Sequence, residues 1–105
     1  GEEFIIALPG MTLAEAYQRA ESLRRAFKKT VTQYKQHTIQ TTFSAGVGAL
    51  PEWGGDQDGL ISMVDKALYE AKKDGRDRVC QIQLDNRPAN AHKFKQEPQS
   101  LNLSI

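Results

Sequence analysis

The residues of this sequence that could do chemistry fall into two charged clusters. The first is Glu2 and Glu3, which follow Gly1 and run directly into an apolar segment. Two carboxylates at the head of a strand can bind Mg²⁺, whose protein sites use one or two carboxylates together with phosphate oxygens. Adjacent strand residues point to opposite faces, so at most one of the pair points at a given site. The alternative is an exposed polar strand end, because glutamate is mostly a surface residue.

The second cluster comprises four cations near the expected end of a helix: Lys72, Lys73, Arg76 and Arg78. Arginine can clamp a polyphosphate through its planar fork, and lysine can do so as a point charge. The alternative is a solvated helix end, where cations are favoured because that end of the helix dipole is negative. Taken alone, each cluster is better explained by a solvated surface than by a binding site.

Composition narrows the function classes. The chain has 105 residues, enough for one domain, and its net charge of +1 argues against nonspecific nucleic-acid binding and against a membrane surface. Its single cysteine, Cys80, excludes an intramolecular disulfide and a cysteine-rich zinc site, which fits a cytoplasmic location. No apolar run approaches the roughly 20 residues of a membrane span. A longer parent protein could still be membrane-anchored through an upstream region.

The first half of the chain is expected to form a strand and a long helix. Residues 4–8 are a continuous apolar run closed by Pro9, typical of a strand buried on both faces. Thr12 and Glu15 match a capping box, which predicts a helix over residues 12–29. Apolar residues recur on one face of it: Leu13, Ala16, Tyr17, Ala20, Leu23 and Phe27. The cations of its last turns are explained by a solvated, dipole-matched helix end: Arg24, Arg25, Lys28 and Lys29.

The second half predicts two more strands and a helix between them. Residues 39–47 alternate apolar and polar, which indicates a strand with one face more buried than the other, and a loop should follow it. Leu60, Ile61, Val64, Ala67, Leu68 and Ala71 form a second helical stripe that ends before Gly75. The segment 78–82 reads as a short strand. The predicted element order is therefore β-α-β-α-β.

Three segments together resemble the C-terminal part of a GGDEF domain, the family of bacterial diguanylate cyclases. "GEEFIIALPG" is similar to the signature GG[D/E]EF and the strand after it, so the match begins inside the signature. "TTFSAGVGAL" is similar to the strand T-x-S-x-G-V, and "MVDKALYEAKKDGRDRV" to A-D-x-A-L-Y-x-A-K-x-x-G-R-N-x-V, with Asp77 where the family more often has Asn. The resemblance covers residues 1–82, and residues 83–105 are expected to be a polar tail or linker.

The resemblance implies a fold and an activity. The fold is a palm-like α/β (α+β) domain, ferredoxin-like and of the nucleotidyl-cyclase type, with helices packed on a mainly antiparallel sheet. The activity is condensation of two GTP into cyclic di-GMP with Mg²⁺, or alternatively Mn²⁺, by a homodimer in bacterial signalling. Two other readings are a non-catalytic GGDEF module that binds GTP or cyclic di-GMP as a regulator, and an unrelated phosphate-binding or interaction domain.

Site residues carry over from the family one at a time. Glu2 matches the carboxylate that binds the metal and is implicated in activating the ribose 3′-hydroxyl, and Glu3 matches a second acidic position near the same metals. Gly1 matches the glycine whose backbone lies close to the nucleotide. Lys72 and Arg76 match the two cations that contact the triphosphate, which for these two outweighs the explanation by a solvated helix end.

The resemblance also implies what this chain lacks. The family's first strand, which bears a metal-binding aspartate, lies between the signature strand and the "TTFSAGVGAL" strand and would precede residue 1. We therefore expect a gap in the sheet, a strand-swapped or intertwined dimer or a rearranged sheet, and no activity from this chain alone.

Overall fold

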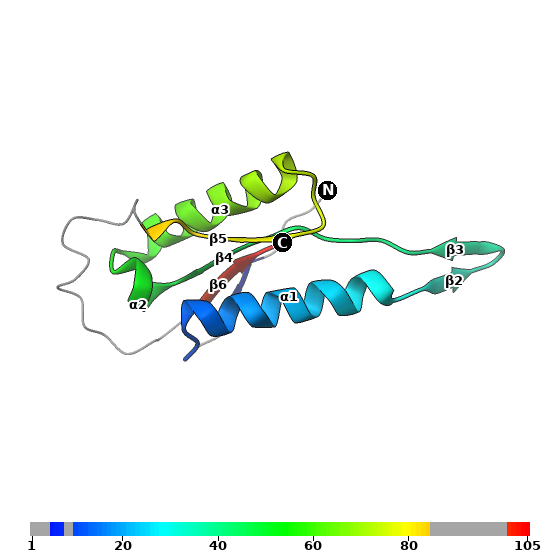
Figure 1. Ribbon diagram of the computed structural model, residues 1–105, viewed down its shortest axis with the longest axis horizontal. Helices are drawn as coiled ribbons and strands as arrows, with labels where there is room; N and C mark the ends of the chain where they lie inside the picture. The colour runs from blue at the N-terminus through cyan, green and yellow to red at the C-terminus, as the bar shows by residue number, and fades with distance from the viewer. Residues whose placement is uncertain (1–4, 8–9, 85–100) are drawn as a thin grey trace.

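A computed structural model describes residues 5–7, 10–84 and 101–105 of the chain (Figure 1). Within these residues the elements are, in chain order, β1 (Ile5–Ala7), α1 (Leu13–Lys29), β2 (Thr32–Tyr34), β3 (His37–Ile39), β4 (Ala45–Ala49), α2 (Leu50–Trp53), α3 (Gln57–Lys73), β5 (Val79–Gln81) and β6 (Leu101–Ser104). The expected mixed α/β fold is confirmed. None of the described helices combines the length and the apolar character that crossing a membrane requires.

Both long helices begin at a residue whose side chain caps the first turn. The Thr12 hydroxyl oxygen accepts a hydrogen bond from the backbone amide of Glu15 at 3.2 Å, as the capping box predicts. At the start of α3, the Asp56 carboxylate accepts one from the amide of Gly59 at 2.8 Å. Local sequence therefore fixes where each helix starts, and α1 ends at Lys29 as expected.

The main sheet has the strand order β1-β6-β4-β5. β6 is antiparallel to both of its neighbours, while β4 and β5 are parallel, so the sheet is mainly antiparallel as expected. β2 and β3 form a separate antiparallel hairpin, which extends away from the sheet beyond the end of α1 (Figure 1).

The two halves of the sheet are joined by an additional strand, which makes this a rearranged sheet, one of the expected alternatives. A gap was expected between β1 and β4, and residues 83–105 were expected to be irregular, but residues 101–104 form β6 in that position. The physical reason is that the facing edges of β1 and β4 offer unpaired backbone groups, and an extended segment satisfies both edges at once. The division of the chain at residue 82 stays a prediction.

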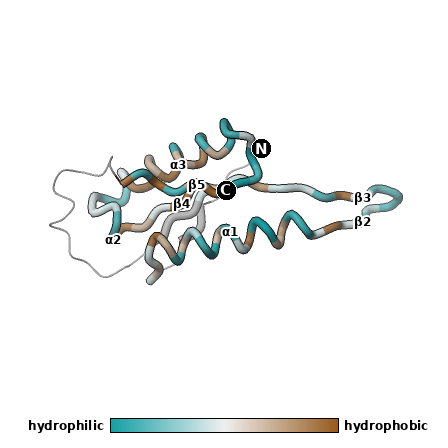
Figure 2. The backbone as a smooth tube through the Cα atoms, in the orientation of Figure 1, coloured by the Kyte–Doolittle hydropathy of each residue, from teal (hydrophilic) through white to brown (hydrophobic). Residues whose placement is uncertain are grey.

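Three local expectations were also wrong. The strand predicted over residues 39–47 is divided, since β3 ends at Ile39 and β4 begins at Ala45, and β4 is buried at all five positions. The loop after it contains the short helix α2. On α1, Leu23 and Phe27 are exposed although they continue the apolar stripe. Figure 2 shows the alternating hydropathy of α1, of which the first half supplies the residues buried in the core.

The core lies on both faces of β4, because α1 and α3 cover opposite sides of the sheet (Figure 1). Gly46 and Gly48 face α3, where a Cβ atom at Gly46 would lie 2.3 Å from the backbone oxygen of Val64. Alternation turns Ala45 and Val47 toward the side of α1, and both are fully buried. The backbone of α3 thus rests directly on β4, which fixes the position of the end of α3.

Candidate functional site

The structure describes two of the five predicted site residues. Lys72 lies in the last turn of α3, and Arg76 lies in the loop between α3 and β5. Gly1, Glu2 and Glu3 lie outside the described residues. The described part of the site is therefore the cationic end of α3 and the loop that follows it.

The sheet register relates this loop to the segment that follows the signature. β1, β4 and β5 all run in the same direction, since β6 is antiparallel to both β1 and β4. Ile5 pairs with Ser104, Ser104 with Gly46 and Gly46 with Cys80, so these four residues form one row across the sheet. Three strand spacings of about 4.8 Å put the two ends of that row about 14 Å apart. The chain thus enters β1 and β5 at the same edge of the sheet.

The loop after α3 has an unusual backbone. Gly75, Arg76 and Asp77 follow one another with φ angles of 120°, 62° and 48°. Glycine adopts positive φ freely and aspartate tolerates it, but for arginine this region costs on the order of 1 kcal/mol. The amide of Arg76 donates a hydrogen bond to the carbonyl of Ala71 at 2.9 Å, which closes the end of the helix. The backbone at Arg76 is therefore held in a conformation that this residue type does not favour.

Contacts with the start of β4 and with the residue before it hold the far side of this loop. The amide of Asp77 donates a hydrogen bond to the hydroxyl of the buried Ser44 at 3.1 Å. The amide of Ala45 donates one to the carbonyl of Arg78 at 3.0 Å, which begins the pairing of β4 with β5. The loop is thus tied to the sheet at its base.

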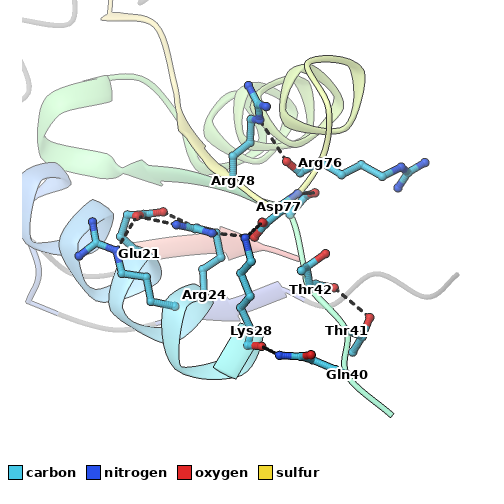
Figure 3. A network of polar contacts seen from close by, with 11 residues as sticks. Glu21, Arg24, Lys28, Gln40, Thr41, Thr42, Arg76, Asp77 and Arg78 are labelled. Carbon is cyan, nitrogen blue, oxygen red and sulfur yellow. Dashed lines mark hydrogen bonds and ion pairs between the residues drawn. The ribbon is translucent and has the colours of Figure 1, made fainter. Parts of the chain in front are cut away.

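Contacts with α1 hold the loop through the Asp77 carboxylate (Figure 3). One carboxylate oxygen lies 2.6 Å from Nη1 of Arg24, and the other lies 2.7 Å from Nζ of Lys28. Glu21 holds the same Arg24 guanidinium from the other side, at 2.6 Å from Nε and 3.0 Å from Nη2. Arg25 also pairs with Glu21, at 3.2 Å, so five charged groups from α1 and the loop form one ionic network beside Arg76.

The network shifts the pKa values of Asp77, Glu21 and Arg24. The hydrogen bond from Lys28, followed by that from Arg24, holds the pKa of Asp77 below its ordinary value. The hydrogen bond from Arg24 lowers the pKa of Glu21, and the two carboxylates raise the pKa of Arg24. Both carboxylates are thus ionised well below pH 7.

Sequence reasoning missed Arg24 and Lys28. It explained them as a solvated helix end, but the side chain of Arg24 is only 15% exposed and its partner Asp77 is 53 positions away in sequence. Two signals were present: the two cations are four residues apart, hence on one helix face, and Asp77 departs from the family's Asn. Neither signal identifies the partner without the fold.

The described residues contain no cluster that could hold a metal ion, counted as three or more His, Cys, Asp or Glu side chains. A cavity of about 490 Å³ lies elsewhere, between α1, α3 and β5, and is lined in part by Tyr17, Met63, Lys66 and Cys80. Burial, followed by the nearby charge of Asp74, raises the pKa of the Cys80 thiol, so this thiol is not an activated nucleophile.

Comparison with known proteins identifies the family. The family model described as "Diguanylate cyclase, GGDEF domain" matches residues 1–78. This chain belongs to the GGDEF family. The resemblance seen in the signature, the second strand and the helix is thereby confirmed, and the mixed α/β fold agrees with it.

Several curated relatives of this GGDEF chain are named as cyclases. It is 40% identical over 84 residues to the diguanylate cyclase VdcA of Vibrio cholerae, covering 78% of this chain and 25% of the relative. It is 37% identical over 79 residues to the diguanylate cyclase DgcP of Pseudomonas aeruginosa, covering 75% and 12%. It is 31% identical over 81 residues to the response regulator PleD of Caulobacter vibrioides, covering 75% and 18%.

The chain therefore spans between an eighth and a quarter of the length of these relatives. No solved structure matches it.

Proposed function

We propose that this chain is the part of a diguanylate cyclase that supplies the signature carboxylates and the triphosphate-binding cations for the condensation of two GTP into cyclic di-GMP. The observation that carries the proposal is the shared edge of the sheet. Arg76 precedes β5 at this edge, and the signature residues precede β1 by sequence. A nucleotide bound along the edge could be contacted from both sides.

Lys72 and Arg76 are proposed to hold the triphosphate. The C-terminal end of α3 carries the negative end of a helix dipole, which by itself repels phosphate. Cations are therefore required there, and an arginine adds a planar pair of donors that matches phosphate oxygens. The family match extends through these residues.

Gly1 is proposed as the backbone position nearest the nucleotide. Glu2 is proposed as a ligand of Mg²⁺, with Mn²⁺ as an alternative, and Glu3 as a second acidic position near the same metals. Their carboxylate oxygens are the donors that these cations prefer. When bound, the metal would stabilise the negative charge that develops on the α-phosphate. The other proposed features are activation of the 3′-hydroxyl by Glu2, a homodimer in which each subunit binds one GTP, and a cytoplasmic location.

The test uses a protein that carries this chain together with the upstream half of the domain that the family resemblance implies. It is incubated with GTP and Mg²⁺, and cyclic di-GMP is measured by chromatography. We expect product that disappears in Glu2→Gln, and a raised KM for GTP in Arg76→Gln. Lys29→Gln, at an exposed cation on α1, is the matched control and should behave as the unmodified protein.

Two results would contradict the proposal in different ways. Nucleotide binding without product would favour the regulatory module, in which the same residues bind GTP or cyclic di-GMP. Neither product nor binding would favour an unrelated interaction domain. In parallel, we expect no product from the 105-residue chain by itself, since the resemblance assigns one metal-binding aspartate to the upstream half.

A further inference from the structure

The backbone conformation of Arg76 needs an external restraint. Left-handed φ at a non-glycine residue is unfavourable, and here two such residues follow Gly75. A free loop of this composition would sample other conformations and would carry the Arg76 guanidinium with it. Whatever fixes Asp77, the next residue, therefore also fixes the direction in which Arg76 leaves the backbone.

Asp77 is fixed from three sides. Its amide is bound to Ser44 on the approach to β4, and its two carboxylate oxygens are bound separately to Arg24 and Lys28 on α1. The two ion pairs are not equivalent. Arg24 is 15% exposed and is itself held by Glu21, which is 14% exposed, whereas Lys28 is 55% exposed. Arg24 is thus the ordered member of the pair, and Lys28 adds a solvated contact.

The carboxylate of Asp77 allows it to bind both cations at once. A carboxylate can accept from both cations at once, one through each oxygen, whereas the amide of the Asn more common in the family has a single acceptor oxygen. A lone carboxylate next to Arg76 would also repel a polyphosphate. Pairing with Arg24 and Lys28 offsets this charge. The whole network, Glu21 and Arg25 included, holds three cations and two carboxylates, a net charge of +1, so no excess negative charge lies beside Arg76.

We propose that Arg24 is a positioning residue that acts through Asp77 to hold Arg76 in the orientation that binds the triphosphate of the nucleotide. This inference rests on the proposed function, because it assigns the ligand of Arg76 as a polyphosphate. Arg24 itself touches Glu21 and Asp77. Its effect on the ligand passes through the loop.

The test measures binding of inorganic tripolyphosphate to the 105-residue chain by calorimetry, with circular dichroism to show that each variant is folded at the assay temperature. We expect Arg24→Gln to weaken binding roughly tenfold, which is the loss of about one charge-assisted contact. Arg25→Gln is the matched control, since Arg25 is the adjacent residue on the same helix, is 69% exposed and pairs with Glu21 at 3.2 Å rather than with Asp77. It should change affinity less than twofold.

Two further variants separate positioning from general effects. In the Arg76→Gln background, Arg24→Gln should cause no additional loss, because two residues that act through one contact are not additive. Arg24→Lys keeps the charge but cannot hold Glu21 and Asp77 together with a planar fork. It should therefore recover only part of the affinity, and full recovery would mean that charge alone matters and would overturn the positioning role.

The remaining outcomes distinguish this inference from the proposed function. If the unmodified chain binds tripolyphosphate and Arg76→Gln weakens binding while Arg24→Gln does not, the positioning role is wrong and the phosphate site stands. If the unmodified chain does not bind, or if Arg76→Gln has no effect, both the site and the positioning role are wrong.

Discussion

Gly46 in β4 is the position where one added methyl group should do the most damage. Its Cβ atom would lie 2.3 Å from the backbone oxygen of Val64 and 2.6 Å from the backbone nitrogen of Leu68. These two atoms belong to the backbone of α3 and are four residues apart, so neither can move unless the helix moves. An ordinary contact needs about 3.4 Å, so α3 would have to shift by about 1 Å from β4.

The magnitude follows from that displacement. Overpacking a core usually costs about 1–3 kcal/mol, and the upper end applies where backbone must move. We expect Gly46→Ala to cost at least about 3 kcal/mol, against a total stability of about 5–15 kcal/mol for a small domain. At about 4 °C or more per kcal/mol, the melting temperature should fall by at least roughly 12 °C.

Gly48→Ala is the matched control, in the same strand and facing the same helix. Its Cβ atom would lie 2.8 Å from Leu60 and Val64 and 3.0 Å from Ile82, in each case from a side-chain methyl group that can rotate away. We expect a cost of about 1–2 kcal/mol. Thermal melts followed by far-ultraviolet circular dichroism compare the two variants. A Gly46→Ala protein at least as stable as Gly48→Ala would refute the argument that the backbone of α3 sets the limit.

Three further predictions concern the network, the cysteine and the added strand. Because the folded-state pKa values of Glu21 and Asp77 lie below 4.5 and 3.8, their ion pairs stabilise the fold above those values and lose this effect as pH falls through the lower folded values. Melting temperature against pH should therefore fall more steeply in acid for the unmodified chain than for Asp77→Asn. Alkylation of Cys80 by iodoacetamide should reach half its maximal rate above pH 9.0 in the folded chain and at lower pH in urea. Removing residues 101–105 should leave β1 and β4 with unpaired edges and produce aggregates in size-exclusion chromatography, and a stable monomer would contradict the role of β6.

Features with local causes were predictable from the sequence. The start of α1 at Leu13 follows from a cap three residues from its partner, and the direction of the α1 stripe follows from helical spacing. The part of the stripe that stays exposed was not predictable, because Leu23 continues the helical spacing and is still 46% exposed. Periodicity reports which face is apolar, and only the partner element decides how far that face is buried.

The candidate site also contains residues that local sequence predicts and residues that depend on a distant partner. Lys72 and Arg76 could be predicted because a family motif spans them in one segment, whereas the proposed role of Arg24 depends on a partner 53 positions away in sequence. The ion pairs join α1 to the loop after α3, so their geometry depends on how both helices pack on opposite faces of β4. No spacing rule within α1 contains that information.

β6 is the strand that the sequence analysis missed, and it sets the distance between the two parts of the candidate site. Residues 83–105 read as a polar tail because their composition is averaged over many polar positions, yet residues 100–105 alternate serine or asparagine with leucine or isoleucine, the period of a half-buried strand. β6 is also the element through which β1 is joined to β4 and β5. The spacing between the entry to β1 and the Arg76 loop is therefore set by a strand from the far end of the chain. A change in β6 that shifts its pairing by one residue would turn the side chains of β6 to the opposite face of the sheet. It would also displace β1 relative to β4 and β5, and so alter that spacing without changing a predicted site residue.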